Sequence, residues 1–436
     1  MNDKQHKVVI VGGGAGGLIL ATRLAKHAKR STKQSTNLSV TLVDESLTHI
    51  WKPLLHEIAA GSLNSYEDEM SYLSHAARHH YDFQLGKFSR IDRQQKLLYL
   101  DEVYDSNGNV LIEARTLKYD SLVFAIGSTN NDFGTPGVKE HCFMLDNRKN
   151  AEYFHTHFIG KFLAARAKQD NESLVHINIV GGGATGVELA GEIYSTMKRI
   201  VTFGLKDFNL DRIKICVIEA GNTILVGQTE KVQKGALKEL KKIGIDVKLN
   251  SKVSEVNSTT IVIDESNILP SSLSVWAAGI SGSMNESAFD GLALNRVKQI
   301  VVNAGLQSHE DESIFAIGDC AECVVDGNRL APRAQVAQQQ AIFLADNFMG
   351  FIDSNNMPEF VFREKGSLIT IGESDAVGNI FASIFGSFYV QGAIAKWAYL
   401  SLYRQHQLQT LGVYRTIIQV LKDSMTRVLG PKIKLH

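Results

Sequence analysis

Two glycine-rich loops with the same spacing carry the most specific chemistry in this 436-residue sequence. The first, GGGAGG, runs from Gly12 to Gly17, and the second, GGGATG, runs from Gly181 to Gly186. In this motif the first glycine makes a tight turn, the second lets the backbone approach a pyrophosphate, and the third lets the following helix pack closely. We therefore expect dinucleotide contacts at three positions in each loop, namely Gly12, Gly14 and Gly17, and Gly181, Gly183 and Gly186.

The elements that must position these loops are also duplicated. An apolar strand is predicted before each loop, at Lys7–Val11 and His176–Val180, and a helix after it, the first beginning near Ala15. The N-terminal amides of such a helix face the phosphates. A second strand then ends in an acid, Asp44 in one unit and Glu219 in the other, whose carboxylate can accept hydrogen bonds from ribose hydroxyls. One such motif is weak evidence, but two complete units predict two nucleotide sites.

The acid of the second unit also bears on nucleotide choice. The carboxylate of Glu219 would repel a ribose 2′-phosphate, and the next residues, Ala220, Gly221 and Asn222, include no arginine to neutralise one. We therefore expect NADH to be preferred over NADPH. Asp44 could bind the adenosine ribose of either FAD or NAD, so it does not assign the first site.

A third segment, Ile314–Asp319 (IFAIGD), places Gly318 and Asp319 at the end of another apolar strand. It resembles the ribitol-binding segment of flavoproteins with two dinucleotide-binding domains, in which the N-terminal loop binds FAD and the inserted loop binds NAD(P)H. The segments Leu122–Gly127 and Val275–Gly279 resemble the strand-to-glycine turns of that superfamily. The resemblance implies non-covalent FAD in the first site and NADH in the second, with further nucleotide contacts at Ala125, Gly127, Ala278 and Gly279.

The four cysteines narrow the choice within that superfamily. None precedes Cys142, so the early redox-active pair of the disulfide reductases is missing. Cys320 and Cys323 have the CxxC spacing of a redox dithiol or half of a zinc site. No second CxxC or paired histidine completes a metal site, so a structural role is favoured and no metal is expected. The intact second loop with Glu219 argues against a sulfide:quinone oxidoreductase, because those enzymes use no nicotinamide.

Several segments along the chain resemble one family closely. They are Trp51–Glu57 (WKPLLHE), Gly181–Glu192 (GGGATGVELAGE), Val275–Ile280 (VWAAGI), Ala316–Cys320 (AIGDC), Pro332–Gln339 (PRAQVAQQ) and Lys432–His436 (KIKLH). Almost end to end, the sequence is similar to the bacterial type II NADH dehydrogenases, which are single-subunit NADH:quinone oxidoreductases. The resemblance implies an enzyme that passes electrons from NADH through FAD to a membrane quinone without pumping protons.

The resemblance also implies roles for particular side chains. Gln335 and Gln339 share a helix face, and in the family they line the quinone pocket, where neutral amides can hydrogen-bond quinone carbonyls. Glu188 lies near the first turn of the second loop's helix; in the family it reaches between nicotinamide and flavin, although such an acid also simply complements the helix dipole. Lys52 would stabilise negative charge on a reduced flavin, and Lys396 is a further candidate for the quinone site.

These observations predict an α/β protein with two Rossmann-like domains and a C-terminal amphipathic helical region. We expect residues 1–145 to form the first half of the FAD-binding domain, 146–285 the NADH-binding domain, 286–375 the second half of the FAD-binding domain, and 376–436 a membrane-association region. The first strand begins by residue 7, which leaves no room for a signal peptide, so we expect the chain to stay on the cytoplasmic side.

Charge is unevenly distributed although 46 basic and 46 acidic residues balance over the whole chain. From residue 376 onward seven basic residues accompany one acid, Asp423. Amphipathic helices are predicted at about Gly392–Gln407 and Gly412–Leu429, with Trp397 among their apolar residues. The uncharged run Ala376–Ala395 is long enough to span a bilayer, but Gly, Ser, Asn and Gln interrupt it. We expect a peripheral protein on the cytoplasmic face of the inner membrane; packing of both helices on the enzyme body is the alternative.

Two other functions remain open at this stage. A soluble NADH-dependent reductase of ferredoxin or another electron carrier would need no amphipathic tail. A non-enzymatic NADH-sensing flavoprotein would turn over negligibly with quinones. A nucleic-acid partner is not expected, whereas a homodimer is possible, and the sequence leaves open which quinone is used and in what order the substrates bind.

Overall fold

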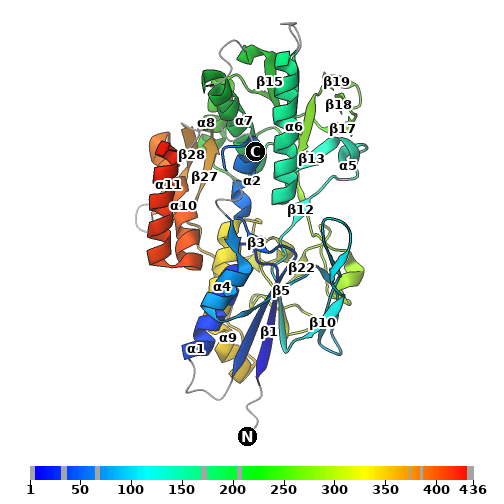
Figure 1. Ribbon diagram of the computed structural model, residues 1–436, viewed down its shortest axis with the longest axis vertical. Helices are drawn as coiled ribbons and strands as arrows, with labels where there is room; N and C mark the ends of the chain where they lie inside the picture. Colours follow the sequence, from blue (N-terminus) through cyan, green and yellow to red (C-terminus); the bar gives the residue numbers. More distant parts are fainter. Residues whose placement is uncertain are drawn as a thin grey trace. The chain divides into compact units, whose positions relative to one another are not determined.

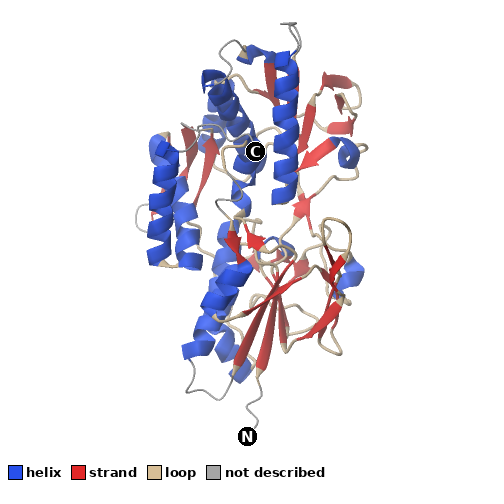
Figure 2. Cartoon of the chain, in the orientation of Figure 1, coloured by secondary structure: helices blue, strands red, loops and turns tan. Residues whose placement is uncertain are grey.

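The computed structural model describes residues 5–30, 37–63, 69–167, 174–203, 209–372, 375–382 and 386–429. The chain forms two compact units. The first comprises Met1–Trp51, Glu69–Thr129 and Ile280–Arg363, and the second comprises Lys52–Asp68, Asn130–Gly279 and Glu364–His436. Each unit mixes helices with strands (Figure 2), as expected for an α/β protein.

The first unit is built on a parallel five-stranded sheet in the order β23-β11-β1-β2-β5. Its strands are short apolar runs that are almost wholly buried in the middle of the sheet, as is usual for parallel sheets covered on both faces. They are β1 (His6–Val11), β2 (Leu38–Asp44), β5 (Asp82–Leu85), β11 (Ser121–Phe124) and β23 (Ile314–Ala316). The helices of this unit are α1 (Gly17–Arg30), α4 (Tyr72–His79) and α9 (Ala334–Ser354).

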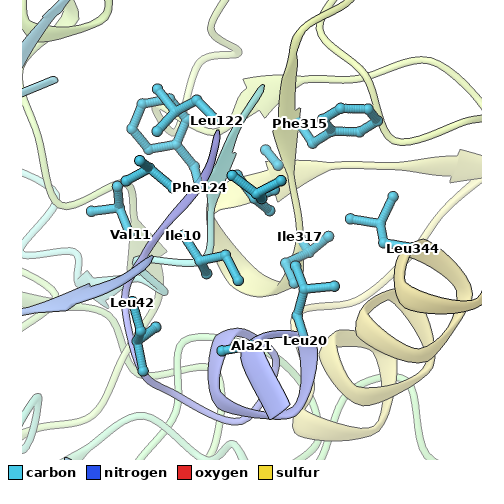
Figure 3. Packing of buried hydrophobic residues seen from close by; sticks show 14 of the residues in the cluster. Ile10, Val11, Leu20, Ala21, Leu42, Leu122, Phe124, Phe315, Ile317 and Leu344 are labelled. Carbon is cyan, nitrogen blue, oxygen red and sulfur yellow. The ribbon is translucent and has the colours of Figure 1, made fainter. Parts of the chain in front are cut away.

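The core of this unit joins strands and helices that are far apart in the sequence. Ile10 of β1 points toward Leu20 of α1, and Leu344 of α9 lies beside Ile317 (Figure 3), whereas Phe124 of the neighbouring strand β11 lies on the other face of the sheet. All five side chains are at most 1% exposed. Their burial ties the first glycine loop, which lies between β1 and α1, to the segment that follows β23.

The second unit repeats the same arrangement of a five-stranded parallel sheet with a glycine loop and a helix after its central strand, which we call the nucleotide-binding frame. Its parallel sheet has the order β13-β20-β14-β15-β16. The strands are β13 (Cys142–Met144), β14 (Val175–Val180), β15 (Ile213–Ile218), β16 (Asp246–Lys248) and β20 (Leu273–Trp276), and the helices include α6 (Arg148–Ala167), α7 (Ala184–Phe203) and α8 (Glu230–Lys242). Each glycine loop therefore follows the central strand of its sheet. Asp44 is the last residue of β2, and Glu219 directly follows β15.

Each unit also carries a three-stranded antiparallel sheet, inserted in the chain between two strands of the parallel sheet: β5 and β11 in the first unit, and β16 and β20 in the second. In the first unit it consists of β6 (Phe88–Asp92), β7 (Leu97–Leu100) and β10 (Arg115–Lys118). In the second it consists of β17 (Val253–Val256), β18 (Thr260–Ile263) and β19 (Asn267–Pro270). The duplication thus extends beyond the motifs visible in the sequence.

The C-terminal part of the second unit is a small antiparallel sheet followed by two helices. The sheet contains β27 (Gly366–Ile371), β28 (Asp375–Ala382) and β29 (Gly386–Gln391). Helices α10 (Ala393–Leu411) and α11 (Val413–Leu429) lie side by side (orange and red in Figure 1), close to the bounds predicted from amphipathic periodicity. Within the described ranges, no helix is both long enough and apolar enough to cross a membrane.

The remaining elements are short. They are β3 (Thr48–His49), η1 (Lys52–Leu54), α2 (Leu55–Ala60), β4 (Met70–Ser71), β8 (Val103–Tyr104), β9 (Val110–Ile112), β12 (Thr129–Asn130), α5 (Val138–His141), η2 (Leu210–Arg212), β21 (Ile280–Ser281), η3 (Glu286–Phe289), β22 (Ile300–Val301), η4 (Gly318–Cys320), β24 (Ala321–Glu322), β25 (Val324–Val325) and β26 (Asn328–Arg329).

The two units divide the chain at places that differ from the domain boundaries expected at residues 145, 285 and 375. The segment just before residue 145 contains β13, which pairs in parallel with β20 of the second unit. At the other end, Glu364 to the C-terminus belongs with the second unit, because β27 packs on α7 and α10 packs on β27. The physical reason is long-range strand and helix pairing, which local composition does not reveal.

Candidate nucleotide sites and a buried carboxylate

Steric contacts explain two glycines of the first loop, Gly12 and Gly17. Gly12 has φ +100°, and a Cβ there would lie 2.4 Å from the carbonyl oxygen of Ala125. A Cβ on Gly17 would lie 1.9 Å from the oxygen of Gly12, so α1 can start this close to β1 only with glycine at that position. A Cβ on Gly14 would meet nothing within 4 Å. The loop is therefore closed on its inner side and open above Gly14, which is the space a pyrophosphate needs.

The second loop has the same geometry. Gly181 has φ +112°, and a Cβ there would lie 2.8 Å from the carbonyl of Ala277. A Cβ on Gly186 would lie 2.0 Å from the oxygen of Gly181, and one on Gly183 would meet nothing within 4 Å. The residues present thus fit a dinucleotide in both units, although the individual contacts of these glycines with a nucleotide stay a prediction.

The two acids accept hydrogen bonds from the loops that precede them in the chain. The amide of Gly13 donates to Asp44 Oδ2 over 2.7 Å, and the amide of Gly182 donates to Glu219 Oε2 over the same distance. The second oxygen of each carboxylate accepts from a nearby amide, that of Ser46 or Gly221. Burial raises the pKa of Asp44 to about 6. Each carboxylate oxygen has further acceptor capacity, so ribose hydroxyls can still bind there.

The segment after β23 reaches the turn after β11, because the two strands are neighbours in the sheet. Ser128 directly follows Gly127, one of the predicted nucleotide contacts. Its hydroxyl donates to Asp319 Oδ2 over 3.2 Å. Gly318 has φ +72°, and its amide donates to the buried Gln340 Oε1 over 2.7 Å. Ser128 and Gln340 were missed by the sequence analysis; Ser128 could have been found from its place next to Gly127, whereas Gln340 carries no local signal.

Cys320 and Cys323 are buried free thiols. The thiol of Cys320 donates to the carbonyl oxygens of Phe124 and Ile317 over 3.5 and 3.3 Å. Burial raises the pKa of Cys320 to about 12, so its reactive thiolate is scarce at neutral pH. Among the described residues no group of histidine, cysteine and acidic side chains is arranged to hold a metal ion. These observations favour the structural role for the CxxC pair.

Gln335 and Gln339 lie in the first turns of α9, as the sequence predicts. The side-chain amide of Gln339 bridges the backbone of Arg363: its Nε2 donates to the Arg363 carbonyl over 2.8 Å, and the Arg363 amide donates to its Oε1 over 3.0 Å. Nε2 of Gln339 also lies 3.4 Å from Oε1 of Gln335. The structure therefore brings the two glutamines together and adds an anchoring contact that spacing could not reveal.

Glu188 is buried in α7, with its carboxylate surrounded by the second unit. The amide of Thr370 in β27 donates to Oε1 over 3.3 Å, and His56 Nδ1 of α2 lies 3.7 Å from Oε2. Burial, followed by the negative charges of Glu57 and Glu192, raises the pKa of Glu188 to about 8. Burial lowers the pKa of His56 to about 4, so at neutral pH a neutral imidazole faces a mostly protonated carboxyl. Such a carboxyl can donate or accept a proton near neutral pH.

The other predicted contacts lie on turns and helices of the second unit. Ala278 and Gly279 follow β20, and Gly279 has φ +65°. Lys52 is exposed at the start of η1. Burial raises the pKa of Asp146, and the positive charge of Lys52 offsets part of that rise. Lys396 belongs to α10, and its side chain lies outside the described part of the structure, as does the whole Lys432–His436 segment. The roles of these residues stay predictions.

Comparison with known proteins finds relatives that are similar over nearly the whole chain. A family model described as pyridine nucleotide-disulphide oxidoreductase matches residues 6–341. A type II NADH:quinone oxidoreductase of Haemophilus influenzae is 40% identical over 98% of this chain and 99% of its own length. One of Staphylococcus aureus is 30% identical over 87% of this chain and 91% of its own length.

Solved structures agree on the fold. The structure of NDH2 from Plasmodium falciparum in complex with NADH superposes with a TM-score of 0.83 at 20% identity, covering 98% of this chain and 100% of that chain. The family assignment rests on three findings that agree: two complete nucleotide-binding frames, sequence similarity from near one end to the other, and the shared fold. The chain belongs to the pyridine nucleotide-disulphide oxidoreductase family and, within it, to the type II NADH:quinone oxidoreductases.

Proposed function

We propose that this protein passes two electrons from NADH through non-covalent FAD to a quinone at a membrane surface, without pumping protons. The observation that carries the proposal is the presence of two complete nucleotide-binding frames in one chain whose curated relatives are NADH:quinone oxidoreductases. FAD, when bound, accepts a hydride from NADH and returns the electrons to the quinone. The protein's part is to hold each nucleotide in a fixed orientation.

We assign FAD to the first unit and NADH to the second. The first loop shares its unit with Gly318 and Asp319, whose position at the turn after β11 suits the ribitol and pyrophosphate of FAD. The second loop is braced by Glu219, whose carboxylate suits an unphosphorylated ribose. Glu188, held protonated near neutral pH, is the candidate for positioning the nicotinamide or exchanging a proton with the reaction.

We assign the quinone to the face of α9 that carries Gln335 and Gln339, with Lys396 as a further candidate. The side-chain amide of Gln339 bridges the Arg363 backbone. Gln339 then acts mainly by holding the helix and the Arg363 segment together.

Anaerobic stopped-flow measurements test this assignment. Flavin bleaching by NADH reports the first half-reaction, and reoxidation by a short-chain quinone reports the second. Gln335→Leu and Gln339→Leu should each slow quinone reduction about tenfold, the effect of losing one or two hydrogen bonds, while bleaching stays fast. Asn347→Leu, on the same helix, is the matched control and should change neither rate. Equal slowing of both half-reactions would contradict the assignment.

Helices α10 and α11 support attachment to a membrane surface, because many of their apolar side chains are exposed while several polar ones are buried. The buried polar residues include His406, Gln407, Thr410 and Thr416, which are at most 5% exposed. Apolar residues face outward, and those at least 43% exposed are Ile394, Trp397, Leu408, Val413, Tyr414, Ile417, Ile418, Leu421 and Met425. An exposed apolar surface of this kind marks an interaction site, and its basic neighbours suit anionic lipids.

Binding to vesicles that contain anionic lipid tests the attachment. Replacing Ile417 and Leu421 by Asp should reduce the bound fraction at least about tenfold, since two apolar side chains worth roughly 1.5 kcal/mol each leave the bilayer. The matched control is Ile268→Asp, an exposed apolar residue of β19, which should leave binding unchanged. Release from native membranes only by detergent, with no effect of salt or of deleting residues 376–436, would contradict a peripheral attachment. We also propose that the protein attaches to the cytoplasmic face of the membrane.

A further inference from the structure

The carbonyl group of Gly13, in the middle of the first loop, is held by two side chains from the segment between β2 and β5. The hydroxyl of Tyr72 donates to it over 2.7 Å, and Nδ1 of His49 lies 3.0 Å from it. Because a carbonyl only accepts, His49 must carry its proton on Nδ1 and donate as well. Both side chains are buried, at 3% and 6% exposure, so these bonds are shielded from water.

The geometry of one peptide group shows what this contact controls. The carbonyl of Gly13 and the amide N–H of Gly14 belong to the same planar trans peptide and point in opposite directions. Fixing the carbonyl toward Tyr72 and His49 therefore fixes the amide of Gly14 away from them. A Cβ on Gly14 would meet nothing within 4 Å, so the residue lies at the open space above the loop. The preceding peptide is held by the bond from Gly13 to Asp44.

The two side chains are themselves firmly held. The ring of Tyr72 stacks on Phe83, with centroids 5.1 Å apart, and His49 lies on β3, which pairs with β4 just before Tyr72. Burial lowers the pKa of His49 to about 4, so the imidazole is neutral at physiological pH. Burial also raises the pKa of Tyr72, with the nearby charge of Asp44 adding to the effect, so its hydroxyl keeps its proton.

We propose that Tyr72 and His49 are positioning residues for FAD, which set the direction of the loop amide at Gly14 and thereby the affinity of the first site. The inference rests on the proposed function, because it takes FAD as the nucleotide of the first unit. It assigns the two residues a role in cofactor retention and none in the chemistry of electron transfer.

The holoenzyme provides the test. Tyr72→Phe removes one hydroxyl and keeps the stacked ring, and it should speed the release of FAD, followed by the rise in flavin fluorescence on dilution, about five- to tenfold. The KM for NADH and the bleaching rate per bound flavin should stay as in the unsubstituted protein. Tyr81→Phe is the matched control: its hydroxyl bonds to His75 Nδ1 over 2.8 Å in the same unit, and its loss should leave FAD release unchanged.

His49→Phe provides an independent second variant, which keeps an aromatic ring but has no donor. It should speed FAD release by a similar factor, and the double variant should release FAD faster than either single one. Release at the original rate from both single variants, or an equal increase in Tyr81→Phe, would overturn the inference while leaving the proposed function intact. Purified unsubstituted protein that binds no FAD would instead overturn the proposed function.

Discussion

The two nucleotide-binding units are the same frame built twice, with one edge strand taken from a different part of the chain. In the first unit the strand beside β11 is β23, which comes almost 200 residues later; in the second the strand beside β20 is β13, which comes before the whole frame. Parallel neighbours need only a crossover connection of sufficient length, so either source completes the sheet. The nucleotide motif therefore depends on the central strands and not on where the edge strand originates.

The units also differ in how the loop is held. In the first, the carbonyl of the second loop glycine, Gly13, is held by side chains, those of Tyr72 and His49. In the second, the carbonyl of Gly182 accepts the backbone amide of Leu225 over 2.8 Å. Substitution can remove the first arrangement but not the second.

A third difference lies two residues after the last loop glycine. The first unit has the fully buried Ile19 at this position, and the second has Glu188. An apolar side chain thus satisfies the frame, whereas a buried carboxylate costs free energy when ionised. The acid is therefore not required by the fold, which supports a role in the reaction.

The largest expected effect on nucleotide binding comes from the glycines that the two frames share. Gly17→Ala would place a Cβ 1.9 Å from the oxygen of Gly12, and Gly186→Ala one 2.0 Å from that of Gly181, so the helix must move in each case. Overpacking of about 3 kcal/mol corresponds to an affinity loss of about 100-fold. Gly17→Ala should lose FAD, measured by flavin content, while Gly186→Ala should keep FAD and lose its bleaching by NADH.

Gly14→Ala and Gly183→Ala are the matched controls. A Cβ at either position meets no protein atom within 4 Å, so thermal unfolding should stay as in the unsubstituted protein. Only nucleotide affinity should fall, because the methyl group occupies the space left for the phosphates. Loss of both nucleotides in either Gly17→Ala or Gly186→Ala would show that the two frames are not independent.

A different effect, on stability and not on nucleotide binding, is expected where the units differ, at Glu188. Its pKa is raised from 4.5 to about 8, so the folded protein holds a proton that the unfolded chain releases above pH 4.5. Stability should therefore fall as pH rises from about 4.5 to 8 and level off above that. Glu188→Gln removes this dependence and should stabilise the protein by roughly 3–5 kcal/mol at pH 8, with no gain below pH 4.5.

Thermal unfolding measured across this pH range checks the expectation. Glu286→Gln, at an exposed position in the same chain, is the control and should change the pH profile little. If Glu188→Gln gave the same gain at pH 4 and pH 8, the carboxyl would not be the titrating group. A slower flavin bleaching in the same variant would add evidence for its part in the reaction with NADH.

The smallest effect concerns nucleotide choice in the second unit. Glu219→Ala removes the carboxylate that repels a 2′-phosphate and also the brace to Gly182, so kcat/KM for NADH should fall about tenfold while that for NADPH changes less. The ratio of the two kcat/KM values measures the effect, and the unsubstituted protein should prefer NADH. A preference for NADPH in the unsubstituted protein would refute the assignment of Glu219.

Local patterns in the sequence were enough for the elements that carry the motifs. The predicted strand Lys7–Val11 corresponds to β1, and the predicted helix at Gly412–Leu429 corresponds to α11. Buried parallel strands are continuous apolar runs and amphipathic helices repeat every three to four residues, so both leave a signal within a single element. Glycine spacing adds a steric requirement that is equally local.

Contacts between distant segments were decided only by the tertiary structure. Tyr72 lies 59 residues after Gly13, and Thr370 lies 182 residues after Glu188, and neither pair leaves a pattern in the sequence. The same holds for the bridge from Gln339 to Arg363. The sequence by itself determined the two nucleotide frames, because their requirements are steric and local. Which side chains hold the loops and surround the buried carboxylate depended on packing, because only the folded chain brings those residues within hydrogen-bonding distance.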